Sequence, residues 1–414
     1  MRFVLGLACG LPLLLPVTAA QGQSGDFLAA LAATRSSDAE SATSYLADAL
    51  LKDPGEQALI RQQMRILTIE GDFDAALEYA QDFLQIDAED QLALNIVRIE
   101  AIKRGDWSSA LYTLPRPAGA RLDDIIEAIA YTSILTGDGQ IDKALTKIED
   151  GLDAIGFSHL GNYARGLVYT TQAEYENAAD AFAAFINQDP FQYPRMAQIA
   201  AEALERSGDT DNAKLLYEAL LTTGARVAGE AGLRRIAQGE AMPDALAIEP
   251  LDIYTELLFV IARLLAEQDS PQLAYRFAQE IGYLLTPQSS LYPGYTEVIA
   301  SSLLELERYE EAETFYAALE QVEEFKLAAL LGQVQALSDQ RRYDDALSVL
   351  DEAEDLLGGA PGINRQRGIL YFRAQDYKSA VDAFAAWRDQ VPTLGTGAAQ
   401  PLFIAGISHY RLDD

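Results

Sequence analysis

The sequence predicts an all-α protein, a right-handed α-solenoid of about ten helix-turn-helix units with one interruption. Three features lead to this prediction: an alanine that recurs in register, a turn residue five positions before it, and an apolar residue nine positions before it. Self-similarity with a period of roughly 20 to 50 residues is typical of stacked structural units. The ten alanines are Ala42, Ala76, Ala110, Ala144, Ala178, Ala213, Ala274, Ala312, Ala346 and Ala380.

The alanines mark the second helix of each unit. Successive gaps between them are 34, 34, 34, 34, 35, 61, 38, 34 and 34 residues. Three positions before the alanine the side chain is usually apolar or aromatic, as in Phe73, Trp107 and Tyr175. We therefore expect the alanines at close contacts between helices and the aromatic side chains around them.

The first helix of each unit is predicted from the residue nine positions before the alanine. This residue is apolar or aromatic in all ten units, as the inner face of an amphipathic helix requires. The ten residues are Ala33, Leu67, Ala101, Leu135, Tyr169, Leu204, Leu265, Leu303, Leu337 and Tyr371.

The two helices of a unit are joined by a turn five positions before the alanine. Glycine suits this position because it adopts the left-handed conformation that ends a helix. The first six units place there Ser37, Gly71, Gly105, Gly139, Ala173 and Gly208. The last four units have Asp269, Glu307, Arg341 and Gln375, so we expect these turns to form without glycine.

One stretch contains the repeat positions most completely. They are Gly166, Tyr169, Ala173, Tyr175, Ala178, Phe182 and Pro190. This pattern resembles the tetratricopeptide repeat (TPR), a helix-turn-helix unit of about 34 residues. The second half of the chain is also similar to long exported TPR proteins of alphaproteobacteria. The resemblance implies a superhelix with a concave groove that binds polypeptide.

The 61-residue gap interrupts the array. We expect a helix over residues 228–238, followed by a loop that contains Pro243 and Pro250. The predicted division is residues 21–224 for an N-terminal array, 225–250 for the insertion and 251–414 for a C-terminal array. A decayed repeat and a docking loop both account for the insertion, and we favour the decayed repeat.

The last residues, 400–412, predict one more first helix without a second helix after it. A terminal helix of a repeat array is expected to have a polar outer face. This one carries Leu402, Phe403, Ile404, Ile407 and Tyr410. Either this helix caps the array imperfectly or the array is cut in mid-repeat, and we favour the cut. Self-association through this helix is a separate alternative.

The first twenty residues predict a secretory signal peptide. Arg2 gives a positive start, residues 3–16 are apolar, and Ala19 and Ala20 are small residues that suit cleavage. The apolar run is too short to span a bilayer, and its two prolines disfavour a buried helix. We expect an exported, periplasmic chain, without a lipid anchor on Cys9 because the apolar run continues past it.

Composition narrows the class of partner. The formal net charge is −32, from 63 acidic and 31 basic residues. Such a chain is a poor ligand for nucleic acids and anionic membrane surfaces, which bind positive surfaces. Cys9 is the only cysteine, so the processed chain is expected to contain neither a disulfide nor a thiolate metal site.

No catalytic or metal-binding pattern stands out. His159 and His409 stand outside any metal-ligand motif, and no P-loop, G-x-S-x-G or dinucleotide fingerprint is present. The acidic run 209–211 lacks the glycine and glutamate of a calcium loop. Other carboxylates lie at helical spacing, as on solvated faces. We therefore predict a non-enzymatic protein without cofactor or metal.

The resemblance implies that first-helix positions 13, 10, 6, 3 and 2 residues before each turn line the concave groove. In the first five units these 25 positions include no acidic residue and four basic ones. In the next five units they include seven acidic residues: Glu202, Glu205, Glu256, Glu267, Glu297, Glu305 and Asp339. The N-terminal groove is thus a largely apolar trough with basic points.

Such a trough suits an extended or helical peptide with apolar anchors. The predicted contacts are Arg61, Arg65, Leu92, Asn95, Ile99, Ile102, Lys103, Ile126, Ile129, Leu160, Tyr163 and Leu167. The alternatives are a register shifted by one residue, or packing of these side chains on neighbouring helices.

The expected function is therefore an exported scaffold that binds a protein or peptide in its concave groove. The alternative is a regulatory or scaffolding part of an envelope enzyme complex, with catalysis on another chain or beyond residue 414. Placing either in envelope assembly is an analogy at the level of the fold.

Overall fold

The structure is a computed structural model that describes residues 24–35, 39–114, 121–186, 194–221, 226–242, 248–285, 289, 292–323, 325–357, 361–391 and 398–413. The chain divides into two compact units, residues 1–66 and 67–414. The predicted leader, Cys9, Pro190 and Pro243 lie outside the described residues.

The smaller unit contains α1 (Ser24–Arg35), α2 (Ala39–Lys52) and most of α3 (Gln57–Ile69). Helices α1 and α2 pack against each other as one helix pair, and Ala42 is fully buried in α2. Lys52 at the end of α2 forms an ion pair with Asp26 in the first turn of α1. The predicted first helix-turn-helix unit is therefore present.

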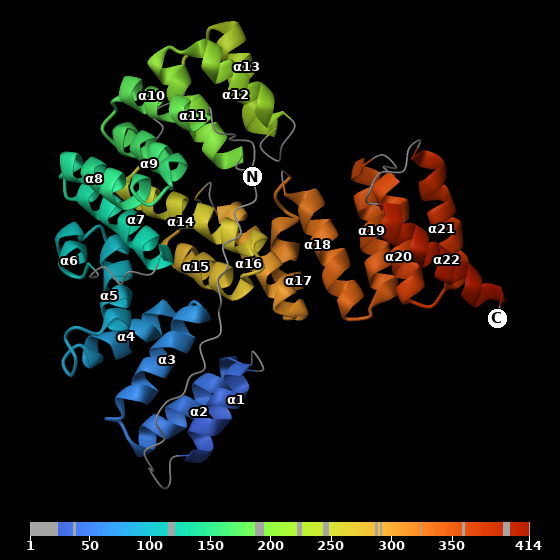
Figure 1. Ribbon diagram of the computed structural model, residues 1–414, viewed down its shortest axis with the longest axis horizontal. Coiled ribbons are helices and arrows are strands. Elements are labelled where there is room, and N and C mark those ends of the chain that lie inside the picture. Colours follow the sequence, from blue (N-terminus) through green and yellow to red (C-terminus); the bar gives the residue numbers. More distant parts are fainter. Residues whose placement is uncertain are drawn as a thin grey trace. The chain divides into compact units, whose positions relative to one another are not determined.

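The larger unit begins at the end of α3, and its described residues form helices joined by turns and short connections, without a strand (Figure 1). Its helices are α4 (Phe73–Phe83), α5 (Gln91–Lys103), α6 (Trp107–Tyr112), α7 (Arg121–Gly137), α8 (Ile141–Ile148) with the π-helical turn η1 (Glu149–Asp153), α9 (Ser158–Thr171), α10 (Tyr175–Ile186), α11 (Pro194–Ser207), α12 (Thr210–Leu220), α13 (Arg226–Gln238), α14 (Pro250–Glu267), α15 (Pro271–Leu284), α16 (Tyr292–Glu305), α17 (Tyr309–Leu319), α18 (Lys326–Asp339), α19 (Tyr343–Leu357), α20 (Pro361–Arg373), α21 (Tyr377–Gln390) and α22 (Ala399–Asp413).

The prediction of an all-α solenoid is confirmed. In chain order the helices form ten helix-turn-helix pairs, and α13 and α22 are the two described helices outside these pairs. From α9 to α13 and from α14 to α22, each helix packs against the next one along the chain. All ten marker alanines have an exposed fraction of 0 %. The repeat alanine is therefore fully buried in every unit.

The turns also form as predicted. Nine of the ten turn positions have a positive φ, between 55° and 89°, and the tenth, Ser37, lies outside the described residues. Four of the nine are the later positions without glycine, Asp269, Glu307, Arg341 and Gln375. In most units the next amide donates to the carbonyl five residues back, as Arg342 does to Leu337 at 2.9 Å. This bond satisfies a carbonyl that the helix end leaves unpaired.

The close approach of two helices at Gly166 is also confirmed. A Cβ atom at Gly166 in α9 would lie 2.3 Å from Cε1 of Phe182 in α10. Both residues are buried. The glycine therefore creates the space that the aromatic ring fills.

The interruption contains α13, which covers the helix expected over residues 228–238. Pro250 is the first residue of α14, where its missing N–H leaves no hydrogen bond unmade. The division at residues 224 and 250 stays a prediction. Helix α22 lies where the last first helix is expected, and its apolar residues Leu402, Phe403 and Tyr410 are exposed.

Candidate binding surface

Helix α14 contacts helices that lie far from it in the sequence. It packs against α7 and α9 in addition to α15 and α16 (Figure 1). Eleven of its residues are buried, and they cover every face of the helix from residue 253 to 262. A helix that is buried all round belongs to a core. The first helix of the seventh pair therefore fills the inner side of the fourth and fifth pairs.

Polar contacts fix the position of α14. Ser133 in α7 donates through Oγ to the carbonyl oxygen of Pro250 at 2.6 Å. Arg195 in α11 donates through Nε to Oε1 of Glu256 at 3.1 Å. Burial raises the pKa of the Glu256 carboxyl, although Arg195 favours its ionised form. The buried Tyr163 hydroxyl has a raised pKa, because of burial and the nearby Glu256.

Helix α15 continues the contact toward the start of the larger unit. The hydroxyl of Tyr283 lies 2.6 Å from Glu100 Oε2 and 3.0 Å from Asp74 Oδ1, so the two carboxylates share its single proton as acceptors. Its ring stacks on Phe73 with centroids 4.9 Å apart, and the Lys103 ammonium lies 3.3 Å from the ring centroid. These contacts join α15 to the second and third helix pairs.

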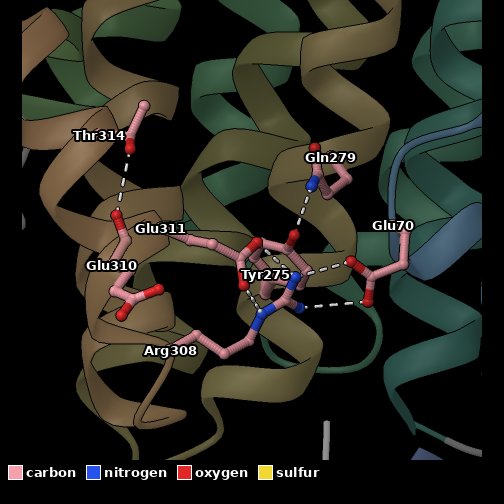
Figure 2. A network of polar contacts seen from close by, with 7 residues as sticks. All are labelled: Glu70, Tyr275, Gln279, Arg308, Glu310, Glu311 and Thr314. Atoms are coloured by element: carbon pink, nitrogen blue, oxygen red, sulfur yellow. Dashed lines mark hydrogen bonds and ion pairs between the residues drawn. The ribbon is translucent and has the colours of Figure 1, made fainter. Parts of the chain in front are cut away.

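A third link lies at α17. Figure 2 shows Arg308 between the carboxylates of Glu70 and Glu311, beside the ring of Tyr275. Its guanidinium donates to both oxygens of Glu70, at 3.2 and 2.8 Å. Gln279 donates to the Tyr275 hydroxyl at 2.7 Å on the other side of the ring. Helix α14 thus contacts α7 and α9, helix α15 contacts α4 and α5, and the N-cap residue of α17 contacts Glu70 in the turn after α3.

The predicted groove residues can now be placed. Those in the larger unit that are buried are Ile99, Ile102, Ile129, Leu160, Tyr163 and Leu167. Leu92, Asn95 and Ile126 are half-buried, and Lys103 is exposed above Tyr283. Arg61 is half-buried and Arg65 is exposed in the smaller unit. Helix α14 covers the trough around α7 and α9, so this part of the trough is not open. The role of these residues as contacts of a partner stays a prediction.

Several acidic residues at the concave positions of the later pairs form ion pairs with arginines. Glu205 pairs with Arg235, Glu297 with Arg263, and Asp339 with Arg373, at 2.8, 2.7 and 2.6 Å. Between α14 and α16 the surface is hollowed by a cavity of about 280 Å³. The cavity is lined by Arg263, Ala266, Glu267, Asp269, Pro271, Glu297, Val298, Ser301, Ser302, Leu304 and Glu305. The sequence placed the acids on this face but gave no sign of the hollow.

Two further properties bear on chemistry. Among the described residues, no cluster of three or more histidine, cysteine or acidic side chains has a geometry that holds a metal ion. None of the described helices combines the length and the hydrophobicity that a membrane crossing requires.

The helix pairs, left-handed turns and buried alanines define the chain as a helical-repeat solenoid of the tetratricopeptide type. No family model matches the sequence, and no curated protein matches it.

Solved structures with similar helical repeats were found. A chain of the Naa15/Naa10 complex bound to HypK-THB is 13 % identical, with a TM-score of 0.36; the match covers 93 % of this chain and 62 % of that one. The P58(IPK) TPR domain is 14 % identical over 94 % of this chain and 98 % of its own, with a TM-score of 0.27. A chain of the APC/C hetero-tetramer Cut9–Hcn1 is 11 % identical over 94 % and 96 %, with a TM-score of 0.35.

Proposed function

We propose that the protein is a non-enzymatic scaffold that holds a polypeptide partner on the concave face of its helix pairs. One observation carries the proposal: this face of α7 and α9 already holds a polypeptide helix, α14. The binding mode is that of an apolar helix in a groove, with a few polar contacts that fix its position.

The partner would bind the concave face of the later pairs, α16, α18 and α20, because α14 occupies that of the earlier pairs. Concave positions there combine carboxylates with apolar side chains, among them the exposed Leu331 and the half-buried Ile369 and Phe372. Stacked pairs hold this surface in place before binding, so less conformational freedom is lost when the partner binds.

We further propose that the chain is exported to the periplasm, on the strength of its leader-like first twenty residues. N-terminal sequencing of the protein from the cells that make it tests this point. A processed chain that begins at residue 20 or 21 supports export, and an intact leader contradicts it.

The binding proposal is tested by photo-crosslinking in those cells. A benzoylphenylalanine replaces Leu331, which is 38 % exposed on α18, or Tyr112, which is 91 % exposed on α6 as the matched control. We expect a discrete protein adduct from position 331 and not from position 112. Failure to capture a protein at position 331, or the same adducts from both positions, would overturn the proposal.

A further inference from the structure

The cavity between α14 and α16 has the form of a side-chain pocket in the concave face. Seven of its lining residues occupy concave positions of two successive first helices: Arg263, Ala266, Glu267, Glu297, Ser301, Leu304 and Glu305. Its volume of about 280 Å³ far exceeds the ~15 Å³ that a single water needs. The pocket can therefore admit a whole side chain from a partner.

The pocket has a strong negative charge. It contains four carboxylates, on Glu267, Asp269, Glu297 and Glu305, against the single guanidinium of Arg263, so its formal charge is −3. Arg263 lies 2.7 Å from Glu297 and 4.0 Å from Glu267. Asp269 and Glu305 are exposed and form no ion pair with any residue that the structure describes, so their carboxylates add to this charge. Carboxylates around a partly enclosed space attract a cation more strongly than the same charges on a flat surface.

A buried hydroxyl in the pocket provides a second, independent observation. Ser302 lines the cavity and is 1 % exposed, yet its Oγ has no hydrogen-bond partner among the described residues. A buried polar group without a partner is unfavourable by about 1–3 kcal/mol, and native proteins contain few of them. A hydroxyl oxygen can accept a hydrogen bond from an ammonium or a guanidinium. A cationic ligand would satisfy it.

We propose that this pocket receives a lysine or arginine side chain of the polypeptide partner, which makes the scaffold selective for basic segments. The inference rests on the function proposed above and adds the chemistry of the partner to it. The cationic head lies among the carboxylates and the Ser302 hydroxyl, and the aliphatic stem packs on Ala266 and Leu304. Leu331, at the same repeat position of α18 as Glu297 in α16, provides the neighbouring apolar contact.

The test measures the fluorescence anisotropy of two labelled helical peptides with purified protein of residues 21–414. One peptide contains leucine, alanine and lysine, and the other is the same sequence with every lysine acetylated. Acetylation removes the charge and keeps the stem. We expect the acetylated peptide to bind at least about tenfold more weakly, and lysine-peptide binding to weaken as salt screens the charges.

Three variants locate the binding. Glu305→Gln and Glu267→Gln are each expected to weaken lysine-peptide binding about threefold to fivefold. The matched control, Glu310→Gln, makes the same change of charge on the exposed face of α17 outside the pocket and is expected to have little effect. Ser302→Ala is expected to weaken binding while the melting temperature stays the same or rises, because an unpaired buried hydroxyl is removed.

Four results would overturn the inference: no binding of the lysine peptide, equal binding of the acetylated peptide, an equal loss with Glu310→Gln and Glu305→Gln, or undiminished binding to Ser302→Ala. The crosslinking experiment separates this inference from the proposed function. If position 331 captures a protein partner while the pocket variants bind the lysine peptide as well as the wild type does, the function stands and the charge selectivity fails.

Discussion

Arg308, the N-cap residue of α17, and Glu70, in the turn that follows α3, form a two-point ion pair across 238 residues of sequence (Figure 2). The side chain of Arg308 is 12 % exposed and that of Glu70 is 24 % exposed. Fork-to-fork pairing of this kind is among the stronger polar contacts in proteins. It links the eighth helix pair to the second one and therefore closes a long-range contact that the repeat period alone does not require.

Replacing Arg308 with methionine should reduce the free energy of unfolding by about 1–3 kcal/mol, because Glu70 loses its charged partner in a partly buried position. Urea unfolding followed by circular dichroism measures the change. Arg342→Met is the matched control: Arg342 occupies the same repeat position in the next pair, is 44 % exposed, and pairs with Glu313 and Asp345. A loss no larger than that of the control would contradict a role for the Arg308–Glu70 contact in stability.

The buried carboxyl of Glu280 should make stability depend on pH. Burial raises its pKa above the ordinary value of 4.5, and it accepts a hydrogen bond from the Tyr254 hydroxyl. Because the folded state holds the proton more tightly than the unfolded state does, this contribution to stability is complete below about pH 4.5. It is lost as the pH rises through the raised pKa.

The variant Glu280→Gln keeps an acceptor for Tyr254 and does not titrate. The unfolding free energy of the wild type, relative to that of the variant, should therefore fall as the pH rises above about 4.5. Urea titrations from pH 4.5 to 8 measure this difference, with the exposed Glu310→Gln as the control. A difference that stays constant with pH would refute the effect of burial.

Gly166→Ala should be destabilising by about 1–3 kcal/mol, because the added Cβ would overlap the Phe182 ring in a packed core. Gly406→Ala provides the comparison, since a Cβ at Gly406 in α22 meets no atom within 4 Å. Alanine there should leave stability unchanged or raise it by up to about 1 kcal/mol. Thermal unfolding measures the change in stability of each variant. Equal changes in the two variants would argue against the close approach of α9 and α10.

Turns without glycine store backbone strain. Arg341 has a φ of 62°, so Arg341→Gly should stabilise the fold by about 0.5–1 kcal/mol after the extra freedom of glycine in the unfolded chain is counted. The reverse change, Gly139→Ala at a φ of 75° with no atom nearby, should be destabilising by a similar amount. Calorimetric unfolding of both variants measures the two changes in stability. A loss of stability in Arg341→Gly would contradict backbone strain at this turn.

The repeat units could be predicted from the sequence because their determinants are local. Ala178 and Gly166 set the contact inside one pair, and the turn position ends one helix five residues before the next alanine. Long-range closure has no such signature, because the curvature of a solenoid results from small rotations summed over many pairs. The packing of α14 on α7 and α9 was therefore not predicted, although the sequence left open whether the trough side chains bind a partner or pack on neighbouring helices.

One signal for that packing was present in the sequence. From Ile253 to Leu265 apolar residues occur on every face of the predicted helix, a pattern typical of complete burial rather than of one inner stripe. The acidic concave positions were visible as well. The pocket could not be predicted from the sequence, because it depends on the spacing between α14 and α16. It also depends on the buried Ser302 hydroxyl, whose lack of a hydrogen-bond partner is visible only in the structure.

Hydrogen exchange of the α14 amides tests most directly whether the chain fills its own concave face. Residues 253–262 lie in the core beneath α7 and α9. In the described part of the chain, α20 packs mainly against its neighbours α19, α21 and α22. Buried core helices exchange through global unfolding. We predict that the amides of residues 253–262 exchange much more slowly than those of α20. Exchange in α14 as fast as in α20 would contradict the account.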